Sequence, residues 1–355
     1  MINPRRHVIA FNRMSALAFA LCISLLVSCQ PLVPPTPTAL PTASTDIFAL
    51  NQRLGRGVNL GNALEATYEG EWGLVLQEDY FRLIAEAGFT SIRVPIRWSA
   101  HAAPQAPYTI DEPFLQRVDW VIQQALANHL LVVINMHHYE EMTQDPDGQR
   151  TRFLGIWHAL AEHYQDQPPE VLFELLNEPN TNLLSYRWNA VVKEAIATIR
   201  STNPTRAVIV GPINWNNIND LVNLELPAAD QHLIVTFHFY EPFAFTHQGA
   251  EWVNGSAAWL GTTWEGTDAE QRQILTLFDK AAAWATKHQR PLYLGEFGAY
   301  SKADLASRAR WTAFVARSAE ERAISWAYWE FGAGFGVYDR SRNAWNEDLR
   351  RALVP

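Results

Sequence analysis

Short apolar runs alternate with longer amphipathic segments along the chain from about residue 48 onward. Each apolar run is bounded by Gly, Pro, Asn or Asp, which favours a buried strand over a helix. Because the runs are almost continuously apolar, the strands are expected to be covered on both faces, as in a parallel sheet. Eight strands are predicted in this way, over residues 56–62, 89–96, 130–135, 171–177, 206–210, 232–239, 292–295 and 324–329.

The segments between these runs carry apolar residues at helical spacing. In the clearest helix, Asp111 lies at the cap, Pro113 lies in the first turn, and apolar residues line one face. Helices are predicted over residues 77–87, 111–128, 151–164, 184–200, 268–287 and 302–318, with a short one near 218–224.

The alternation of eight strands with helices predicts an α/β fold, a (β/α)8 TIM barrel that forms a single catalytic domain over residues 47–355. A doubly wound open sheet is the alternative fold. It is less favoured because no Gly-x-Gly-x-x-Gly phosphate loop follows the first strand.

The N-terminal region has a different composition from this domain. Three arginines precede an apolar run over residues 16–27, and Ser28 and Cys29 follow that run. This pattern is typical of a secretory signal, and the sequence before Cys29 resembles a bacterial lipobox. We expect a lipoprotein signal peptide over residues 1–28, although an ordinary signal peptide with a chance cysteine remains the alternative. Cys29 would carry lipid at the head of a Pro- and Thr-rich tether over residues 29–46.

The composition narrows the class of protein further. With 355 residues, of which 48% are hydrophobic and 18% charged, the chain has enough apolar side chains for one large core. The net charge of −9 disfavours nucleic acid as a partner. The two cysteines, Cys22 and Cys29, both precede the domain, so its core has neither disulfides nor thiolate zinc sites.

Polar side chains stand at or just beyond the C-terminal ends of seven predicted strands. In a parallel barrel these ends share one face, and that face carries the active site. Glu178 and Glu296 follow two separate strands, and a pair of carboxylates is what cleavage of a glycosidic bond requires. The polar set comprises Asn62, Glu65, Arg93, His137, His138, Asn177, Glu178, His238, Tyr240 and Glu296, together with the aromatic Trp329.

Some residues near this face have simpler interpretations. A metal site at His137 and His138 is disfavoured because adjacent residues of a strand point to opposite faces. Glu174 lies deeper along its strand than Glu178, and we interpret it as an interior residue paired with Arg93 or a similar donor. Glu330 is interpreted as structural in the same way.

Five tryptophans occur in loops after strands, where some are expected to stack on sugar rings and the others to anchor loops: Trp72, Trp215, Trp252, Trp259 and Trp264.

Seven motifs occur in order between about residues 55 and 340, and together they resemble glycoside hydrolase family 5. The resemblance implies a (β/α)8 fold, retaining hydrolysis and, in the best-known members, endo-β-1,4-glucanase activity. After Pro179 the chain has Asn180, where many relatives carry His. The motifs are Gly57–Glu65, Ile92-Arg93-Val94-Pro95, Met136-His137-His138-Tyr139, Leu176-Asn177-Glu178-Pro179, Phe237-His238-Phe239-Tyr240, Gly295-Glu296-Phe297-Gly298 and Trp326-Ala327-Tyr328-Trp329-Glu330.

The resemblance implies that Glu178 is the general acid/base and Glu296 the nucleophile. Arg93 and Tyr240 suit the task of keeping the nucleophile ionised. His238 is expected to tune Glu178. Asn177 is expected to donate a hydrogen bond to the sugar 2-hydroxyl. The expected substrate-binding residues are Asn62, Glu65, His137, His138, Trp252 and Trp329.

The sequence therefore predicts a retaining endo-β-1,4-glucanase, with the β-glucan chain as its partner and no metal or organic cofactor. A β-mannanase, a xyloglucanase or a mixed-linkage glucanase of the same family is the alternative. A non-catalytic glycan-binding lipoprotein is a remote one, since both glutamates are present. We expect a monomer, placed outside the bacterial cell at its surface and held to a membrane only through lipid on Cys29.

Overall fold

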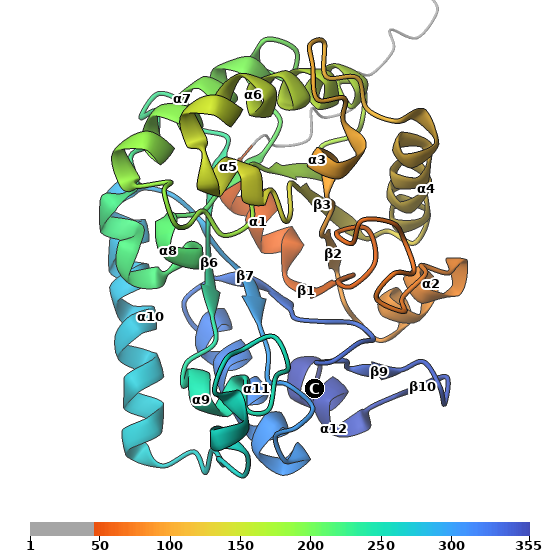
Figure 1. Ribbon diagram of the computed structural model, residues 1–355. Coiled ribbons are helices and arrows are strands. Elements are labelled where there is room, and N and C mark those ends of the chain that lie inside the picture. The colour runs from red at the N-terminus through yellow and green to blue at the C-terminus, as the bar shows by residue number, and fades with distance from the viewer. Residues whose placement is uncertain (1–45) are drawn as a thin grey trace, which may run out of the picture. The chain divides into compact units, whose positions relative to one another are not determined.

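The computed structural model describes residues 46–355, so the signal peptide, Cys29 and all but the last residue of the tether lie outside the described residues. Eight parallel strands pair in sequence order and close into a barrel, which confirms the predicted fold (Figure 1). The strands are β1 (Arg56–Asn59), β2 (Ser91–Val94), β3 (Leu131–Asn135), β4 (Val171–Glu174), β5 (Val208–Val210), β6 (Leu233–Phe239), β7 (Leu292–Phe297) and β8 (Ser325–Tyr328).

Long helices follow most of the strands and surround the barrel, as the amphipathic segments predict. Two of them differ from the predicted bounds at the N-terminal end. The helix after β3 begins at Pro146, because the Asp145 side chain accepts the Gly148 amide and caps an earlier turn. The helix after β7 begins later, at Leu305, behind the Asp304 cap. The long helices are α2 (Glu78–Glu86), α4 (Glu112–Ala127), α6 (Pro146–His163), α7 (Ser185–Arg200), α10 (Asp268–His288) and α11 (Leu305–Glu320).

Short helices lie in the loops that follow the strands and help to build the face at their C-terminal ends. The predicted short helix near residues 218–224 is a 3-10 helix, and Asp111 is the cap residue of α4 without a side-chain capping bond. These elements are α3 (Trp98–His101), α5 (Glu140–Gln144), α8 (Ile213–Asn216), η1 (Ile218–Asn223), α9 (Phe243–Thr246) and η2 (Ser256–Trp259). After β8 come a small hairpin, β9 (Tyr338–Asp339) and β10 (Ala344–Trp345), and then α12 (Glu347–Leu353).

Helix α1 (Ile47–Leu54) precedes β1, and the hydrophobic pattern did not predict it. Ile47 and Leu54 are buried in the same cluster as residues inside the barrel. Asn51 is also buried, donating to the Leu292 carbonyl and accepting the Ser325 hydroxyl. Because Leu292 and Ser325 begin their strands, α1 closes the N-terminal end of the barrel.

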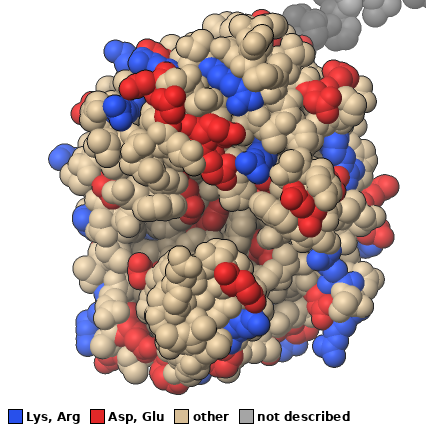
Figure 2. Space-filling view, in the orientation of Figure 1, with Lys and Arg blue, Asp and Glu red and all other residues tan. Residues whose placement is uncertain are grey.

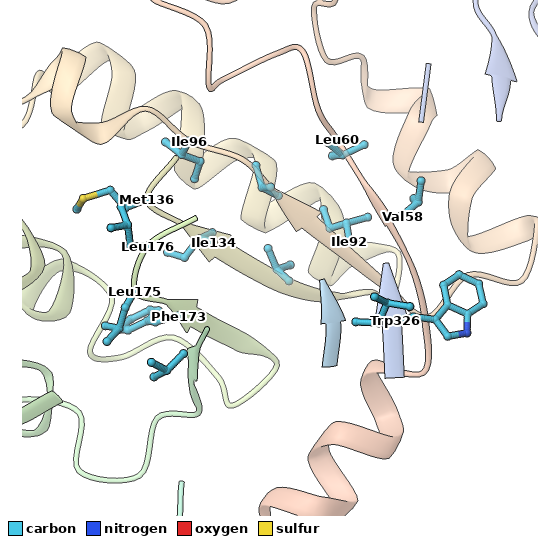
Figure 3. Packing of buried hydrophobic residues seen from close by; sticks show 14 of the residues in the cluster. Val58, Leu60, Ile92, Ile96, Ile134, Met136, Phe173, Leu175, Leu176 and Trp326 are labelled. Atoms are coloured by element: carbon cyan, nitrogen blue, oxygen red, sulfur yellow. The ribbon is translucent and has the colours of Figure 1, made fainter. Parts of the chain in front are cut away.

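The core has two layers because successive side chains of a strand point to opposite faces. One set packs between the barrel and its helices; Val58, Ile92 and Phe173 belong to it (Figure 3). The other set fills the barrel interior. It comprises Leu131, Val133, Leu172, Ala207, Ile209, Ile234, Tyr293 and Ala327 with residues of α1. Nothing in residues 46–355 is a helix both long and apolar enough to cross a membrane.

Above this apolar interior, the inward positions of the strands become polar. Glu174 lies two residues beyond Leu172 on the inward face of β4, and Arg93 lies on β2, which β3 separates from β4 in the sheet. Both side chains have no exposed surface, and they form a bidentate ion pair with two distances of 2.7 Å. This confirms that Glu174 is an interior residue satisfied by Arg93.

Candidate active site

The two predicted catalytic glutamates come together at the C-terminal end of the barrel. A side-chain oxygen of Glu178 and one of Glu296 lie within 4.8 Å of each other, with a ring nitrogen of His238 inside the same radius. A retaining glycosidase has its two carboxyl groups about 5–5.5 Å apart, whereas an inverting one leaves more room for water. The spacing is therefore that of a double-displacement site.

Irregular backbone on the strands gives the pair this geometry. The register between β6 and β7 shifts between Phe237 and His238, so that His238 pairs with Glu296. Gly295 permits the approach, since a Cβ there would lie 2.7 Å from the Thr236 hydroxyl and 3.1 Å from the His238 ring. Glu178 has φ 51°, a left-handed conformation that turns the chain at the mouth of β4.

Arg93 is the centre of the polar network beneath the glutamates. Its guanidinium group offers five N–H donors in a fixed fork, and the structure gives every one of them an acceptor. Besides the two bonds to Glu174, it donates to Asn59 at 2.9 Å, Asn177 at 2.8 Å and Glu296 at 2.7 Å. One buried cation thus fixes side chains from β1, β4 and β7 or their C-terminal ends.

Both carboxylate oxygens of Glu296 accept a hydrogen bond from the protein. Arg93 donates to Oε1, and the Tyr240 hydroxyl donates to Oε2 at 2.8 Å. Burial raises the pKa of Glu296, while the charge of Arg93 and the hydrogen bond from Tyr240 act in the opposite direction. These donors stabilise the ionised form in a dry site, as a carboxylate nucleophile requires.

Glu178 lies in a contrasting environment. Its side chain is 25% exposed, and its Oε1 lies 2.8 Å from Nδ1 of His238. Burial raises the pKa of Glu178 to about 7; the positive charge of Arg93 opposes the rise, and the negative charge of Glu174 adds to it. Burial also lowers the pKa of His238 to about 4, so its imidazole is neutral at neutral pH. The hydrogen bonds from Arg93 and Tyr240 thus favour the ionised form of Glu296, whereas burial favours the protonated form of Glu178.

A cleft opens beside the pair. It has a volume of about 480 Å³, and Glu178, Tyr240, Trp215 and Trp252 are among its lining residues. Figure 2 shows that the face in view is hollowed, with acidic side chains inside the hollow. Trp215 and Trp252 are 56% and 60% exposed, although tryptophan side chains are highly buried on average. Two exposed indole rings in a cleft suit the binding of a ligand. Trp264, by contrast, is buried and anchors its loop.

Trp329 lies half-buried at the end of β8, and its ring is nearly parallel to that of His137, with centroids 5.9 Å apart. His137 is buried and is held by the Asn135 amide at 3.1 Å. His138 is more exposed and meets Trp72 edge-on at 5.6 Å. The two histidine rings lie in contact, with centroids 4.6 Å apart and planes at 82°, so the expectation that they point to opposite faces is wrong. The strand ends at Asn135, and His138 has a left-handed φ of 50°, so strand alternation does not apply to them.

Asn62 and Glu65 lie in the loop after β1. Asn62 is half-buried and has φ 65°. Glu65 is almost fully buried, and its carboxylate accepts the backbone amides of Asn62 and Ala63. Burial raises the pKa of Glu65 to about 7. The carboxylate of Glu65 therefore fixes the loop that carries Asn62. The carboxylate of Glu330 fixes the loop after β8 in the same way, because it accepts hydrogen bonds from the backbone amides of residues 332, 333 and 335.

The sequence did not reveal three amides that complete the site. Asn59 and Asn135 end apolar strands, and their position on the inward face was a signal that could have identified them. Asn59 joins Arg93 to the backbone of β7 and β8, and Asn135 holds His137. Asn216 contacts His238 from the loop after β5, and no periodic pattern marks it.

The cluster of Glu178, His238 and Glu296 is also compact enough to surround a metal ion. Its hydrogen bonds favour proton-transfer chemistry instead. Both oxygens of Glu296 already accept bonds from Arg93 and Tyr240, and the guanidinium cation lies 2.7 Å from one of them. A second cation at this point would meet the positive charge of Arg93.

Gly61 is expected to be needed for the position of Trp329. A Cβ at residue 61 would lie 2.8 Å from the Trp329 ring, closer than real Cβ contacts occur. In a Gly61→Ala variant the indole must move, and KM for cello-oligosaccharides should rise about 3- to 10-fold, the value of one aromatic contact. Asp166→Glu is the control, because it adds one methylene group at an exposed position before β4, away from the active-site face. An unchanged KM for Gly61→Ala would show that Trp329 is not a sugar platform.

Comparison with known proteins identifies the family of the chain. Residues 56–334 match the family described as Cellulase (glycosyl hydrolase family 5). Endoglucanase H of Acetivibrio thermocellus is 37% identical over 89% of the chain, and Endoglucanase C of the same species is 28% identical over 84%. The chain spans 33% of the length of Endoglucanase H and 37% of Cellulase/esterase CelE, but 97% of Endoglucanase C.

Solved structures of similar sequence also include cellulases. Cel5A of Thermotoga maritima, in complex with cellobiose, is 50% identical and superposes with a TM-score of 0.86, over 87% of this chain and all of the other. The same enzyme has also been solved with mannotriose, with the same identity and TM-score. The family match covers the barrel from β1 to the loop after β8 and includes both glutamates, and the chain therefore belongs to glycosyl hydrolase family 5, the cellulase family.

Proposed function

We propose that this protein is an endo-β-1,4-glucanase that hydrolyses its substrate with retention of configuration. The observation that carries the proposal is the pair of carboxyl groups within 4.8 Å, one stabilised by a cation and a hydroxyl, the other raised to a pKa of about 7. Glu296 is the nucleophile and Glu178 the general acid/base.

In the first step, an oxygen of Glu296 attacks the anomeric carbon while the glycosidic bond breaks. Glu178 gives its proton to the departing oxygen, so the leaving chain ends in a free hydroxyl. The sugar remains bound to Glu296 as an ester. Arg93 and Tyr240 keep the nucleophile oriented through its two oxygens.

In the second step, Glu178 is ionised and accepts a proton from water, which attacks the anomeric carbon and releases Glu296. Two inversions give net retention. Asn177 contributes from the neighbouring position. Its amide oxygen is bound to Arg93, which leaves its NH2 group to donate to the 2-hydroxyl of the reacting sugar.

The cleft supports action within a polymer. It is open and is lined by aromatic side chains on one side of Glu178, with Phe243 adding to Trp215 and Trp252. Flat indole rings stack on the apolar faces of sugars, so these side chains suit a substrate with further sugar units beyond the cleavage point. A pocket closed at one end would instead suit removal of terminal residues.

The pH dependence follows from the two carboxyl groups. Glu178 must be protonated for the first step, and its pKa is raised to about 7. We therefore expect kcat/KM for cello-oligosaccharides to fall about tenfold per pH unit above pH 7. At low pH activity should fall as Glu296 becomes protonated, at a pH above the ordinary glutamate range. An activity that stays constant from pH 7 to 9 would contradict the role of Glu178.

Mannan is the second candidate substrate. Cel5A of Thermotoga maritima, 50% identical to this chain, has been solved with both mannotriose and cellobiose. Glucose and mannose differ in the orientation of the 2-hydroxyl, which the site meets through Asn177. An enzyme that accepts both sugars would keep the same two glutamates and the same double displacement.

A parallel product analysis tests the proposed function. Carboxymethylcellulose, lichenan, xyloglucan and galactomannan are each incubated with the wild type and with Glu296→Gln as the inactive control. We expect a rapid loss of viscosity and short cello-oligosaccharides from carboxymethylcellulose. Activity confined to galactomannan would move the assignment to mannanase, and activity on none of the four would overturn it.

A further inference from the structure

Asn216 contacts the acid side of the active site from below the cleft. It is fully buried, and its Nδ2 lies 3.2 Å from Nε2 of His238. The opposite nitrogen of that ring, Nδ1, lies 2.8 Å from Oε1 of Glu178. A continuous chain of hydrogen bonds therefore leads from an amide on the loop after β5, through one imidazole, to the carboxyl group that holds the catalytic proton.

The local backbone is built to place this amide. Asn214, Trp215 and Asn216 have φ values of 57°, 60° and 54°, three left-handed residues in a row, which only specific sequences tolerate. Asn is the residue other than Gly that most readily adopts this conformation. The next residue, Asn217, forms a parallel bridge with His238 itself, so the turn is fixed in register with β6.

Gly211 leaves the space that the side-chain amide of Asn216 occupies. A Cβ on Gly211 would lie 2.0 Å from Oδ1 of Asn216, so any other residue would expel the side chain. The left-handed turn, the bridge to His238 and the space at Gly211 together fix the position of the Asn216 side chain. That side chain touches neither carboxylate, so its effect must pass through His238.

The charges around His238 decide which ring nitrogen carries the proton. Nδ1 faces Glu178 at 2.8 Å and Glu296 at 3.6 Å, so a hydrogen on Nδ1 is favoured over a lone pair at that position. Burial keeps the ring neutral, and Nε2 must then be an acceptor. The amide of Asn216 supplies the donor that this tautomer needs.

We propose that Asn216 is a positioning residue that fixes the Nδ1–H tautomer of His238 and thereby determines which oxygen of Glu178 holds the proton. With Nδ1–H donating to Oε1, the proton of Glu178 resides on Oε2, where it is free to go to the glycosidic oxygen. The proposal rests on the proposed function, in which Glu178 is the acid. It adds a specific control of that acid from a residue that contacts no substrate.

The substitution Asn216→Asp tests this control, because Asp keeps the size and the tolerance for positive φ but accepts where Asn donates. The carboxylate at residue 216 would draw a proton onto Nε2 of His238. Either Nδ1 then becomes an acceptor and binds the proton of Glu178, or the ring becomes cationic and ionises Glu178. In both cases the leaving oxygen loses its proton donor.

The experiment compares two leaving groups. For cellotetraose, which needs protonation, kcat/KM of Asn216→Asp should fall about 100-fold, the lower range of general acid catalysis. For 2,4-dinitrophenyl β-cellobioside, whose leaving group departs without a proton, it should fall less than about threefold. Asn343→Asp, the same exchange at an exposed residue that also has a left-handed φ of 51°, should leave both values unchanged.

Equal losses on both substrates would show a general disturbance of the site, and no loss on either would show that Asn216 does not act; each result overturns the proposal. A second readout is the 15N spectrum of the imidazole of His238, assigned with a His238→Gln variant. We expect Nε2 to be unprotonated in the wild type and protonated in Asn216→Asp, and protonated Nε2 in the wild type would overturn the proposal. If Glu178→Ala itself does not distinguish the two leaving groups, the proposed function fails instead.

Discussion

Replacing Glu296 by alanine is expected to lower the hydrolysis of carboxymethylcellulose by at least about 10⁴-fold, because the variant has no group that can form the covalent intermediate. The loss should extend to substrates with good leaving groups, since the attack on the anomeric carbon is itself missing. Arg93 and Tyr240 would remain, but their hydrogen bonds from the active-site floor would have no carboxylate to orient.

An external nucleophile distinguishes this loss from misfolding. Removal of the side chain leaves a space beside the anomeric carbon, and azide added to Glu296→Ala should attack there directly. One displacement inverts the centre, so the product from 2,4-dinitrophenyl β-cellobioside should be the α-azide. Glu225→Ala, at an exposed glutamate, should behave as the wild type. Substantial hydrolysis by Glu296→Ala without azide would exclude Glu296 as the nucleophile.

Replacing Glu178 by alanine is expected to give a different pattern of loss. Hydrolysis of cellulose-type polymers should fall by about 10³-fold, since neither protonation of the leaving oxygen nor activation of water is possible. Formation of the covalent intermediate from a dinitrophenyl glycoside should remain close to the wild-type rate, and the intermediate should accumulate as an initial burst. The nucleophile and its contacts with Arg93 are unaffected by this change.

The product that Glu178→Ala forms with azide tests the role of the Glu178 carboxyl group. In Glu178→Ala it should replace water in the second displacement and give the β-azide, because two inversions have occurred. The opposite configurations from the two alanine variants would assign the two roles independently of any comparison. An α-azide from Glu178→Ala, or an equal loss on polymer and dinitrophenyl substrates, would contradict the assignment.

The barrel was predictable because its strands are short apolar runs whose order fixes which ends meet. Glu178 and Glu296 were found for the same reason, since both end such runs. Even the pairing of Glu174 with Arg93 followed from counting positions along a strand, because a charge inside a barrel needs a partner. These predictions depended on strand periodicity and topology, which sequence carries directly.

Other features depend on tertiary contacts that leave no periodic signal. Helix α1 is too short to show a clear pattern, and it is stabilised by burial under the barrel and by the contacts of Asn51. The left-handed residues at Asn214 and Trp215 follow from how the loop meets β6 and from the space at Gly211. Glu65 was expected to bind substrate, but whether its carboxylate faces a ligand or the backbone depends on the loop conformation.

The most direct test of the account is the configuration of the first product. Proton NMR, recorded within the first minutes of cellotetraose cleavage, shows the anomer of each newly formed reducing end before mutarotation mixes the two. With the carboxyl oxygens of Glu178 and Glu296 within 4.8 Å, the β-anomer should appear first and the α-anomer only later. Initial formation of the α-anomer would mean a single displacement by water and would contradict the assignment of Glu296 as nucleophile.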